Sequence, residues 1–214
     1  MHESLLLTLQ FTSLAVERQH NVLFDGISGD LQSGEILQIN GPNGSGKSTL
    51  LRILAGFLQP ESGTILWKQN PITKNIEDYQ QQLHYVGHHN ALKHHLTLLE
   101  NINLYCAFSK CTLPLKNILA ILEKINLTHL LHSTTESLSA GQKRRLSLAK
   151  LLMNLRPLWI LDEPATALDI HGQEILINLC HEHLQNGGMI ALATHQPLNI
   201  GREKKEIRLG EMCD

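Results

Sequence analysis

The sequence has little of several features that mark whole classes of protein. Lys and Arg together number 18 against 20 Asp and Glu, so the chain lacks the basic excess expected of a dedicated nucleic-acid-binding protein. Its apolar runs are short, and none approaches the roughly 18 residues that a transmembrane helix needs. Residues 1–4 place no basic segment ahead of the short apolar stretch that follows, so we expect no signal peptide.

Cysteines are few, whereas histidines are numerous. The four cysteines form no C-x-x-C pair and no spacing typical of a zinc site, so we expect reduced thiols. The 13 histidines come partly in close sets, which raises the question of a metal or haem site. Adjacent histidines in loops are more often solvated polar residues, and we favour that interpretation. The residues concerned are Cys106, Cys111, Cys180 and Cys213, and His88, His89, His94, His95, His181 and His183.

What is present is the composition of a soluble globular protein. The 214 residues are 42% apolar and 18% charged, which suits one domain that can bury a full core without disulfides. Short apolar segments predict strands near both ends of the chain, and the middle has helical periodicity. We expect strands at 4–11, 34–40, 64–67, 83–86, 158–161 and 189–194, helices at 46–57, 97–108, from 114 onward and at 169–185, and a short charged tail. This order predicts an α/β core with a helical insertion.

A phosphate-binding loop is predicted at residues 41–48, which fit the pattern G-x-x-x-x-G-K-[ST] between an expected strand and an expected helix. Glycines let the backbone approach an anion closely, and the N–H groups of the loop and of the helix N-terminus point at it. Lys47 would add a positive charge at the β- and γ-phosphates, and the Ser48 hydroxyl could ligate Mg²⁺. The predicted ATP-binding residues here are Gly41, Pro42, Asn43, Gly44, Ser45, Gly46, Lys47, Ser48 and Thr49.

Two acidic residues follow the apolar segment 158–161. Asp162, at the end of a predicted strand, fits the second Mg²⁺-holding element of phosphate-loop NTPases. Glu163 is placed to polarise an attacking water. Taken alone, the pair could be two solvated acids that end a strand. Beside a complete phosphate loop, we interpret them as a metal ligand and a catalytic base.

The segment Leu138-Ser-Ala-Gly-Gln142 distinguishes between the NTPase classes. It resembles the LSGGQ signature of ATP-binding-cassette (ABC) proteins, with Ala140 at the third position. The order of the motifs is also that of the family: phosphate loop, signature, acidic strand, Asp169 and a late histidine, His195. The chain is therefore identified by resemblance as an ABC ATP-binding domain over nearly its whole length.

The resemblance implies a fold and a set of roles. The fold is a phosphate-loop NTPase of the ABC type with a RecA-like core, an N-terminal antiparallel β subdomain and a helical subdomain at about 90–155, all in one domain of residues 1–214. Two copies would form a head-to-tail dimer that sandwiches ATP and Mg²⁺. The signature residues Ser139, Gly141 and Gln142 would contact the γ-phosphate held by the opposite copy. Asp169 would lie across that interface, and His195 would read the γ-phosphate as the switch histidine, although it could instead only cap its strand.

The sequence departs from the usual family pattern in two places. ABC proteins commonly stack an aromatic residue on adenine, and here the comparable stretch offers Arg18, whose guanidinium plane could stack on a base. Arg18 could equally be a solvated hairpin residue. The Q-loop glutamine is also missing after the strand at 83–86, where His89 stands as the candidate metal-site ligand. The alternative is that His89 points to solvent and that His88 or no residue fills the role.

A finer resemblance narrows the family. The short chain, the Val86-Gly-His segment and the segments 158–164 and 194–198 are similar to the CcmA family, the ATP-binding subunits of c-type cytochrome maturation. This resemblance implies a peripheral location on the cytoplasmic face of the bacterial inner membrane, bound to CcmB-like and CcmC-like integral membrane subunits. It implies ATP hydrolysis coupled to haem export or to release of a haem-loaded chaperone.

Other functions remain as alternatives to this one. The nearest is the ATPase subunit of another small bacterial ABC exporter. A non-transport ABC ATPase would usually carry two cassettes or a coiled-coil insertion, and often a basic surface. The signature and His195 argue against a phosphate-loop kinase or GTPase. We expect no nucleic-acid partner.

Overall fold

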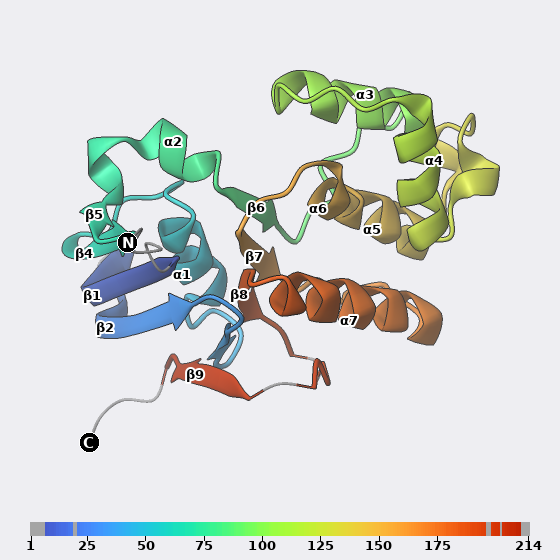
Figure 1. Cartoon of the computed structure of the whole chain (residues 1–214). Helices are drawn as coiled ribbons and strands as arrows, with labels where there is room; N and C mark the ends of the chain where they lie inside the picture. The colour runs from blue at the N-terminus through green and yellow to red at the C-terminus, as the bar shows by residue number, and fades with distance from the viewer. Residues whose placement is uncertain (1–6, 19–20, 196–197, 202, 211–214) are drawn as a thin grey trace. The chain divides into compact units, whose positions relative to one another are not determined.

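The computed structural model describes residues 7–18, 21–195, 198–201 and 203–210, without the side chains of Arg18 and Asn21. The chain forms two compact units (Figure 1). One comprises residues 1–85, 156–163 and 180–214 and contains the sheets. The other comprises residues 86–155 and 164–179 and is helical. The expected helical subdomain at about 90–155 lies within the second unit.

The first sheet of the sheet-containing unit is antiparallel, with the order β2-β1-β4-β5. Its strands are β1 (Thr8–Arg18), β2 (Asn21–Gln32), β4 (Ser62–Trp67) and β5 (Asn70–Pro71). An N-terminal antiparallel sheet was expected and is confirmed. Of the strand predicted at 4–11, residues 4–6 lie outside the described residues, and β1 continues to Arg18. β2 was not predicted, because its polar and glycine-rich sequence lacks regular alternation. Register shifts in its pairing with β1 break that alternation.

The second sheet has the order β6-β7-β8-β3-β9. Strand β3 pairs in parallel with both β8 and β9, and β7 pairs in parallel with β8. All residues of β7 and β8 are buried, which explains their continuous apolar sequences. The bounds are β3 Ile36–Asn40, β6 Leu83–Val86, β7 Leu158–Asp162, β8 Met189–Ala193 and β9 Lys204–Arg208.

The prediction of a short charged tail was wrong over residues 204–208, because β9 is a strand at the edge of this sheet. Its sequence of Lys and Glu shows no apolar alternation, and only Lys204, Lys205 and Ile207 are partly buried. Lys205 lies 2.7 Å from Asp30 Oδ2 and 2.8 Å from Glu35 Oε2. These contacts hold the pKa of the Asp30 carboxyl below its usual value and fasten β9 to the chain around β2.

The helices of the sheet-containing unit are short. They are α1 (Lys47–Leu54), the 3₁₀ turn η1 (Ile72–Lys74) and α2 (Ile76–Gln80). The end of α7 (Ile170–Gln185) also belongs to this unit. There the ring of His183 stacks on Trp159 of β7, with centroids 3.8 Å apart and planes 7° from parallel. Burial lowers the pKa of His183 to about 4.

The helical unit contains α3 (Leu98–Phe108), α4 (Leu115–Lys124), α5 (Ala140–Leu148), α6 (Lys150–Met153), the start of α7 and the 3₁₀ turns η2 (Thr128–Leu130) and η3 (Thr135–Ser137). A capping box begins α3, because the Thr97 side chain accepts from the Glu100 N–H and the Glu100 carboxylate accepts from the Thr97 N–H. Among the described residues, no helix is both long and apolar enough to cross a bilayer. The three cysteines whose placement is described, Cys106, Cys111 and Cys180, are free thiols.

Candidate functional site

The loop between β3 and α1 has the backbone geometry that its glycines permit. Gly41 has a φ of 150°, and a Cβ there would lie 2.6 Å from both the Leu209 carbonyl oxygen and Ser45 Oγ. Gly46 has a φ of 96° at the N-cap of α1, a left-handed conformation that a side chain would strain. The loop therefore turns sharply and delivers the N-terminus of α1 to its concave side, where an anion can bind.

Lys47 is the buried cation of this loop. Its Nζ donates to the carbonyl oxygens of Gly41 and Pro42, each at 2.8 Å. The ammonium thus lies across the turn with its charge directed at the loop. A phosphate anion in the loop would gain this charge in addition to the N–H groups.

Ser48 and Asp162 come together although they are far apart in the sequence. The Ser48 hydroxyl donates to Asp162 Oδ1 at 2.9 Å, and Asp162 is buried at the end of β7. A hydroxyl beside a buried carboxylate offers the oxygen ligands that Mg²⁺ prefers. This pair was predicted from sequence as two metal ligands, and the donor set fits that ion.

Tyr85 of β6 is a neighbour of this pair that the sequence did not reveal. Burial raises the pKa of Tyr85 to about 12, with a smaller contribution from the Asp162 carboxylate, to which its hydroxyl hydrogen-bonds. Its ring also contacts Phe57 edge-on, with centroids 5.2 Å apart. Tyr85 therefore stays protonated and holds the carboxylate of Asp162 from the side of β6.

Glu163 follows Asp162 in an unusual conformation. Its φ is 50°, in the left-handed region, and its backbone N–H donates to the Ala193 carbonyl oxygen at 2.9 Å. This turn sends the Glu163 side chain toward the end of β8, where His195 lies. His195 Nε2 is 3.5 Å from Glu163 Oε1. Both residues predicted to be catalytic thus lie together, with the carboxylate mostly shielded from solvent.

In the helical unit, the signature segment forms the N-terminus of α5. Ser139 is the N-cap, and its Oγ accepts from the Gln142 N–H at 3.1 Å. Gln142 Oε1 accepts in return from the Ser139 N–H at 2.8 Å. Because the oxygen of Ser139 is the acceptor, its hydroxyl proton is not used by this box and can be donated to an anion. A Cβ on Gly141 would lie 3.0 Å from the Ala167 carbonyl oxygen.

Arg144, one turn into α5, is 2% exposed and was not singled out from the sequence. Its Nε donates to the Pro164 carbonyl oxygen at 3.0 Å, and its Nη1 donates to the Gly87 carbonyl oxygen at 2.8 Å. A longer bond of 3.4 Å reaches Asn90 Oδ1. The guanidinium joins α5 to the segment after β6 and to the segment after Glu163. No short motif predicts such a contact, because its acceptors are mainly backbone carbonyls.

The remaining predicted residues are placed as follows. Asp169 is exposed, and its Oδ1 accepts from the Gly172 N–H at 2.7 Å at the start of α7. His89 is exposed in the helical unit, next to the ring of His88, with centroids 5.5 Å apart. The side chain of Arg18 lies outside those described. The described residues include no group of three or more His, Cys, Asp and Glu arranged to hold a metal ion.

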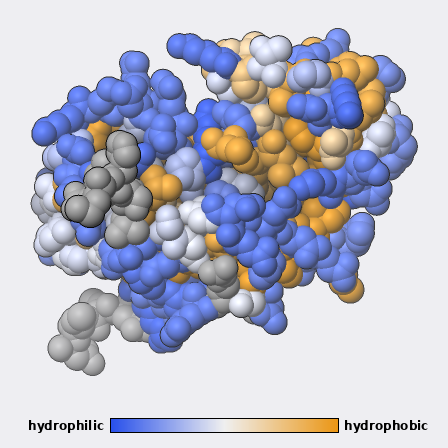
Figure 2. Space-filling model, in the orientation of Figure 1, coloured by the Kyte–Doolittle hydropathy of each residue, from blue (hydrophilic) through white to orange (hydrophobic). Residues whose placement is uncertain are grey.

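A pocket of about 220 Å³ lies in the helical unit, beneath α3. Its walls are mainly apolar, and Figure 2 shows apolar side chains gathered over this part of the chain. Phe108 stands at its rim and is 79% exposed. Lys150 lines it as well, and burial together with the nearby Arg144 lowers the pKa of Lys150 to about 8. The lining includes Asn90, Lys93, Asn101, Phe108 and Lys150.

Known proteins are similar to this chain over residues of both units. Residues 24–166 match the ABC transporter family. The cytochrome c biogenesis ATP-binding export protein CcmA of Vibrio cholerae serotype O1 is 41% identical over 204 residues, covering 95% of this chain and 99% of that protein. The CcmA protein of Pseudomonas aeruginosa is 41% identical over 202 residues, covering 94% and 99%. That of Escherichia coli strain K12 is 39% identical over 196 residues, covering 92% and 93%.

Solved structures show the same fold at lower sequence identity. An ABC transporter ATP-binding protein of Pyrococcus furiosus superposes with a TM-score of 0.81 at 22% identity, covering 94% of this chain and 97% of that one. The ATP-binding subunit of another ABC transporter gives a TM-score of 0.83 at 24% identity, covering 94% and 85%. The mixed α/β fold expected from sequence is confirmed by this likeness.

Proposed function

Because this chain belongs to the ABC transporter family, we propose that it is the ATP-hydrolysing subunit of a c-type cytochrome maturation complex. The chain is an ATPase of the ABC type. Its near-full-length similarity to several CcmA proteins is the observation that carries the finer assignment. In this function, ATP hydrolysis drives haem export or the release of a haem-loaded chaperone.

The sheet-containing unit supplies the hydrolytic groups. The loop N–H groups and Lys47 bind the β- and γ-phosphates of ATP. Ser48 and Asp162 would hold Mg²⁺, which would neutralise charge on the phosphates when bound. Glu163 accepts the proton of the water that attacks the γ-phosphate, which leaves ADP and inorganic phosphate. His195, beside Glu163, donates a hydrogen bond to the transferring phosphoryl group.

The helical unit supplies groups for the second copy. In a head-to-tail dimer, the N-terminus of α5 faces the γ-phosphate of the ATP bound by the opposite copy. The capping box keeps the N–H groups of this end ordered, and the Ser139 hydroxyl proton remains available to the anion. Asp169 lies at the same interface. His89 stands where a Q-loop glutamine is usual and would approach Mg²⁺ or the attacking water.

The partner is proposed to be an integral membrane subunit of the CcmB or CcmC kind, which places this chain at the cytoplasmic face of the inner membrane. The pocket beneath α3 supports a docking surface between residues 88 and 109, because its exposed apolar rim suits a protein partner. Phe108 and Ile170 make a matched pair for testing this, since each is 79% exposed.

The test uses the complex reconstituted in membranes. A photo-crosslinker at position 108 should capture a membrane subunit, whereas one at position 170 should not. Equal capture from both positions would exclude a special docking role for the surface around α3. Co-purification of a membrane subunit from an unrelated exporter would instead support the alternative of another small ABC exporter.

The ATPase assignment is tested in the same preparation. Lys47→Ala removes the cation of the phosphate loop, so ATP turnover should fall to background. Lys116→Ala removes an exposed cation of α4 and should leave turnover unchanged. Turnover near that of the wild type in Lys47→Ala would contradict the proposed phosphate site.

A further inference from the structure

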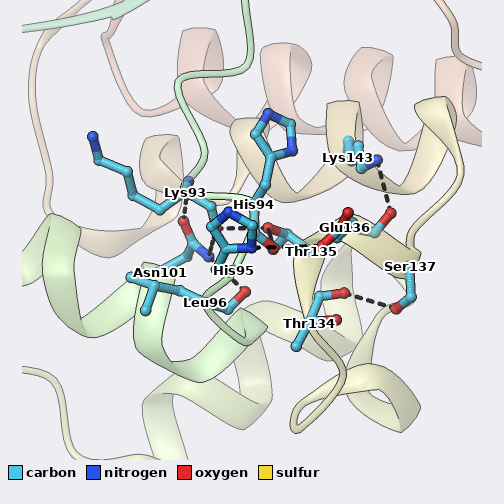
Figure 3. Close-up of polar contacts among 10 residues, drawn as sticks. All are labelled: Lys93, His94, His95, Leu96, Asn101, Thr134, Thr135, Glu136, Ser137 and Lys143. Atoms are coloured by element: carbon cyan, nitrogen blue, oxygen red, sulfur yellow. Dashed lines mark hydrogen bonds and ion pairs between the residues drawn. The ribbon is translucent and has the colours of Figure 1, made fainter.

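Two buried polar side chains of the helical unit have no part in the reaction proposed above. Asn101 of α3 is 8% exposed, and Thr135 at the start of η3 is fully buried. Both bind the backbone of one segment, residues 93–97 (Figure 3). Buried polar groups are costly unless they are hydrogen-bonded, so this arrangement fixes the segment strongly in place.

Asn101 holds the segment from the side of α3. Its Oδ1 accepts from the Lys93 N–H at 2.9 Å. Its Nδ2 reaches the carbonyl oxygens of Lys93 at 3.1 Å, Leu96 at 3.2 Å and Thr97 at 3.0 Å. One carboxamide therefore binds both ends of a tight loop, and the loop cannot move without α3 or without breaking these bonds.

Thr135 holds the same segment from the side of η3. Its backbone N–H donates to the Leu96 carbonyl oxygen at 2.9 Å. Its hydroxyl lies 2.8 Å from the Lys93 carbonyl oxygen and 3.2 Å from that of His94. The Glu136 N–H also donates to the His94 carbonyl oxygen, at 2.9 Å. The carbonyl oxygen of Lys93 is thus shared by the threonine and the asparagine.

Residues 93–97, with Asn101 and Thr135 bound to them, form a junction between two parts of the helical unit that have different proposed roles. On one side, Lys93 forms part of the wall of the pocket beneath α3. On the other side, Thr135 leads within one short turn to Ser139, the N-cap of α5. The Glu136 carbonyl oxygen also accepts from Lys143 Nζ on α5 at 3.1 Å. The junction therefore joins the pocket wall to the N-terminus that carries the signature residues.

We propose that Asn101 and Thr135 are positioning residues that couple occupation of the pocket beneath α3 to the placement of residues 138–142. The proposal rests on the proposed function, in which a membrane subunit docks at this pocket and residues 138–142 meet ATP. A partner that displaces Lys93 displaces carbonyl oxygens to which Thr135 is bonded. Because these bonds are buried, water cannot replace them when the carbonyl oxygens move. Thr135, η3 and the start of α5 therefore move with the segment.

The hydroxyl of Thr135 can be removed with little change of shape. Thr135→Val replaces it by a methyl group, and Thr135→Ser retains the hydroxyl. In the reconstituted complex, the ratio of ATP turnover with the membrane subunits to turnover without them should fall about 2- to 30-fold in Thr135→Val, the range typical of residues along a coupling network. Thr135→Ser should restore most of the ratio. Asn101→Asp, which removes the amide donors, should act in the same direction as Thr135→Val.

A second measurement needs no partner. Hydrogen exchange of the full chain with bound ATP should be faster at the Gln142 and Lys143 amides in Thr135→Val, because both of these N–H groups bond to Ser139. Exchange in α1 should remain unchanged, which separates a local effect from general destabilisation. Thr135→Ser should again return the exchange toward that of the wild type.

The outcomes separate this proposal from the function on which it rests. Equal losses of turnover with and without the membrane subunits would assign Thr135 a purely structural role and overturn the coupling. Unchanged exchange at Gln142 and Lys143 would overturn it as well, whatever the partner does. A wild-type chain that the membrane subunits neither bind nor stimulate would refute the proposed function, and the exchange result would still decide whether the junction positions the start of α5.

Discussion

Glu163 and His195 meet through both backbone and side chain. The His195 N–H donates to Glu163 Oε2 at 3.3 Å, while the imidazole Nε2 lies 3.5 Å from Oε1. The carboxylate is thus held between a strand end and a ring. A base held in this way needs no rearrangement before it accepts a proton, so the loss of its charge should affect chemistry more than binding.

Glu163→Gln should keep ATP binding and lose hydrolysis by about 10²- to 10⁴-fold, because an amide keeps the shape but cannot act as the base. A dimer stabilised by ATP should accumulate, as measured by size-exclusion chromatography with light scattering. Glu77→Gln, at an exposed position of α2, should change neither property. A Glu163→Gln variant that stays monomeric with ATP and its membrane subunits would argue against composite sites.

His89→Ala should lower ATP turnover if the imidazole approaches Mg²⁺ or the attacking water as proposed. A neutral imidazole can accept a hydrogen bond or bind a metal through one ring nitrogen, and an amide oxygen can do the same. His89→Gln should therefore keep more of the turnover than His89→Ala. His88→Ala is the control. Wild-type turnover in His89→Ala would exclude this role for His89.

Arg144→Lys should destabilise the helical unit although the charge is kept. A lysine has no planar fork, so it cannot serve the Gly87 and Pro164 carbonyl oxygens together. One buried acceptor left without its donor costs about 1–3 kcal/mol. Urea unfolding followed by circular dichroism should show this loss, while Arg145→Lys should lose less, because Arg145 is only half-buried and bonds at the more exposed end of α4. Equal losses in the two variants would remove the special importance of Arg144.

The His183 imidazole should contribute to the pH dependence of stability. Its pKa is lowered to about 4 in the folded chain, below the ordinary value of about 6.5, so the unfolded chain binds the proton more readily. The contribution is present above about pH 6.5 and is lost as the pH falls from there toward 4. His183→Phe keeps a ring beside Trp159 and removes the titration, so it should flatten the loss of melting temperature over that range. His181→Phe, at an exposed position of the same helix, should leave the slope as in the wild type.

The sequence predicted the structure best where a residue pattern fits only one backbone conformation or one environment. The phosphate loop requires glycines at positive φ, and these were predicted in the right place at Gly41 and Gly46. The fully buried strand β7 was equally clear, because a continuous apolar run that ends in acids has few other structural explanations. The S-x-x-Q pattern of Ser139 and Gln142 also signals a capping box, so the start of α5 can be predicted from these two residues as well.

Sequence was least informative where tertiary partners decide the structure. Strand β9 has a polar sequence and exists because β3 offers it a free edge. Tyr85 reads as an ordinary strand residue, and only the fold brings its hydroxyl to Asp162. Thr135 likewise has no local signal, since its acceptors come from a segment about forty residues earlier. Long-range hydrogen bonds of this kind leave no periodicity in a single chain.

The guanidinium of Arg144 has a consequence for how this chain can change over evolutionary time. Two of its bonds go to main-chain carbonyl oxygens, which every amino acid provides. As far as these bonds are concerned, lineages can exchange Gly87 and Pro164 for other residues without compensation. Arg144 has no such freedom, because no other side chain offers two diverging donors at that reach. Substitutions in related chains should therefore accumulate around the arginine while the arginine itself is retained.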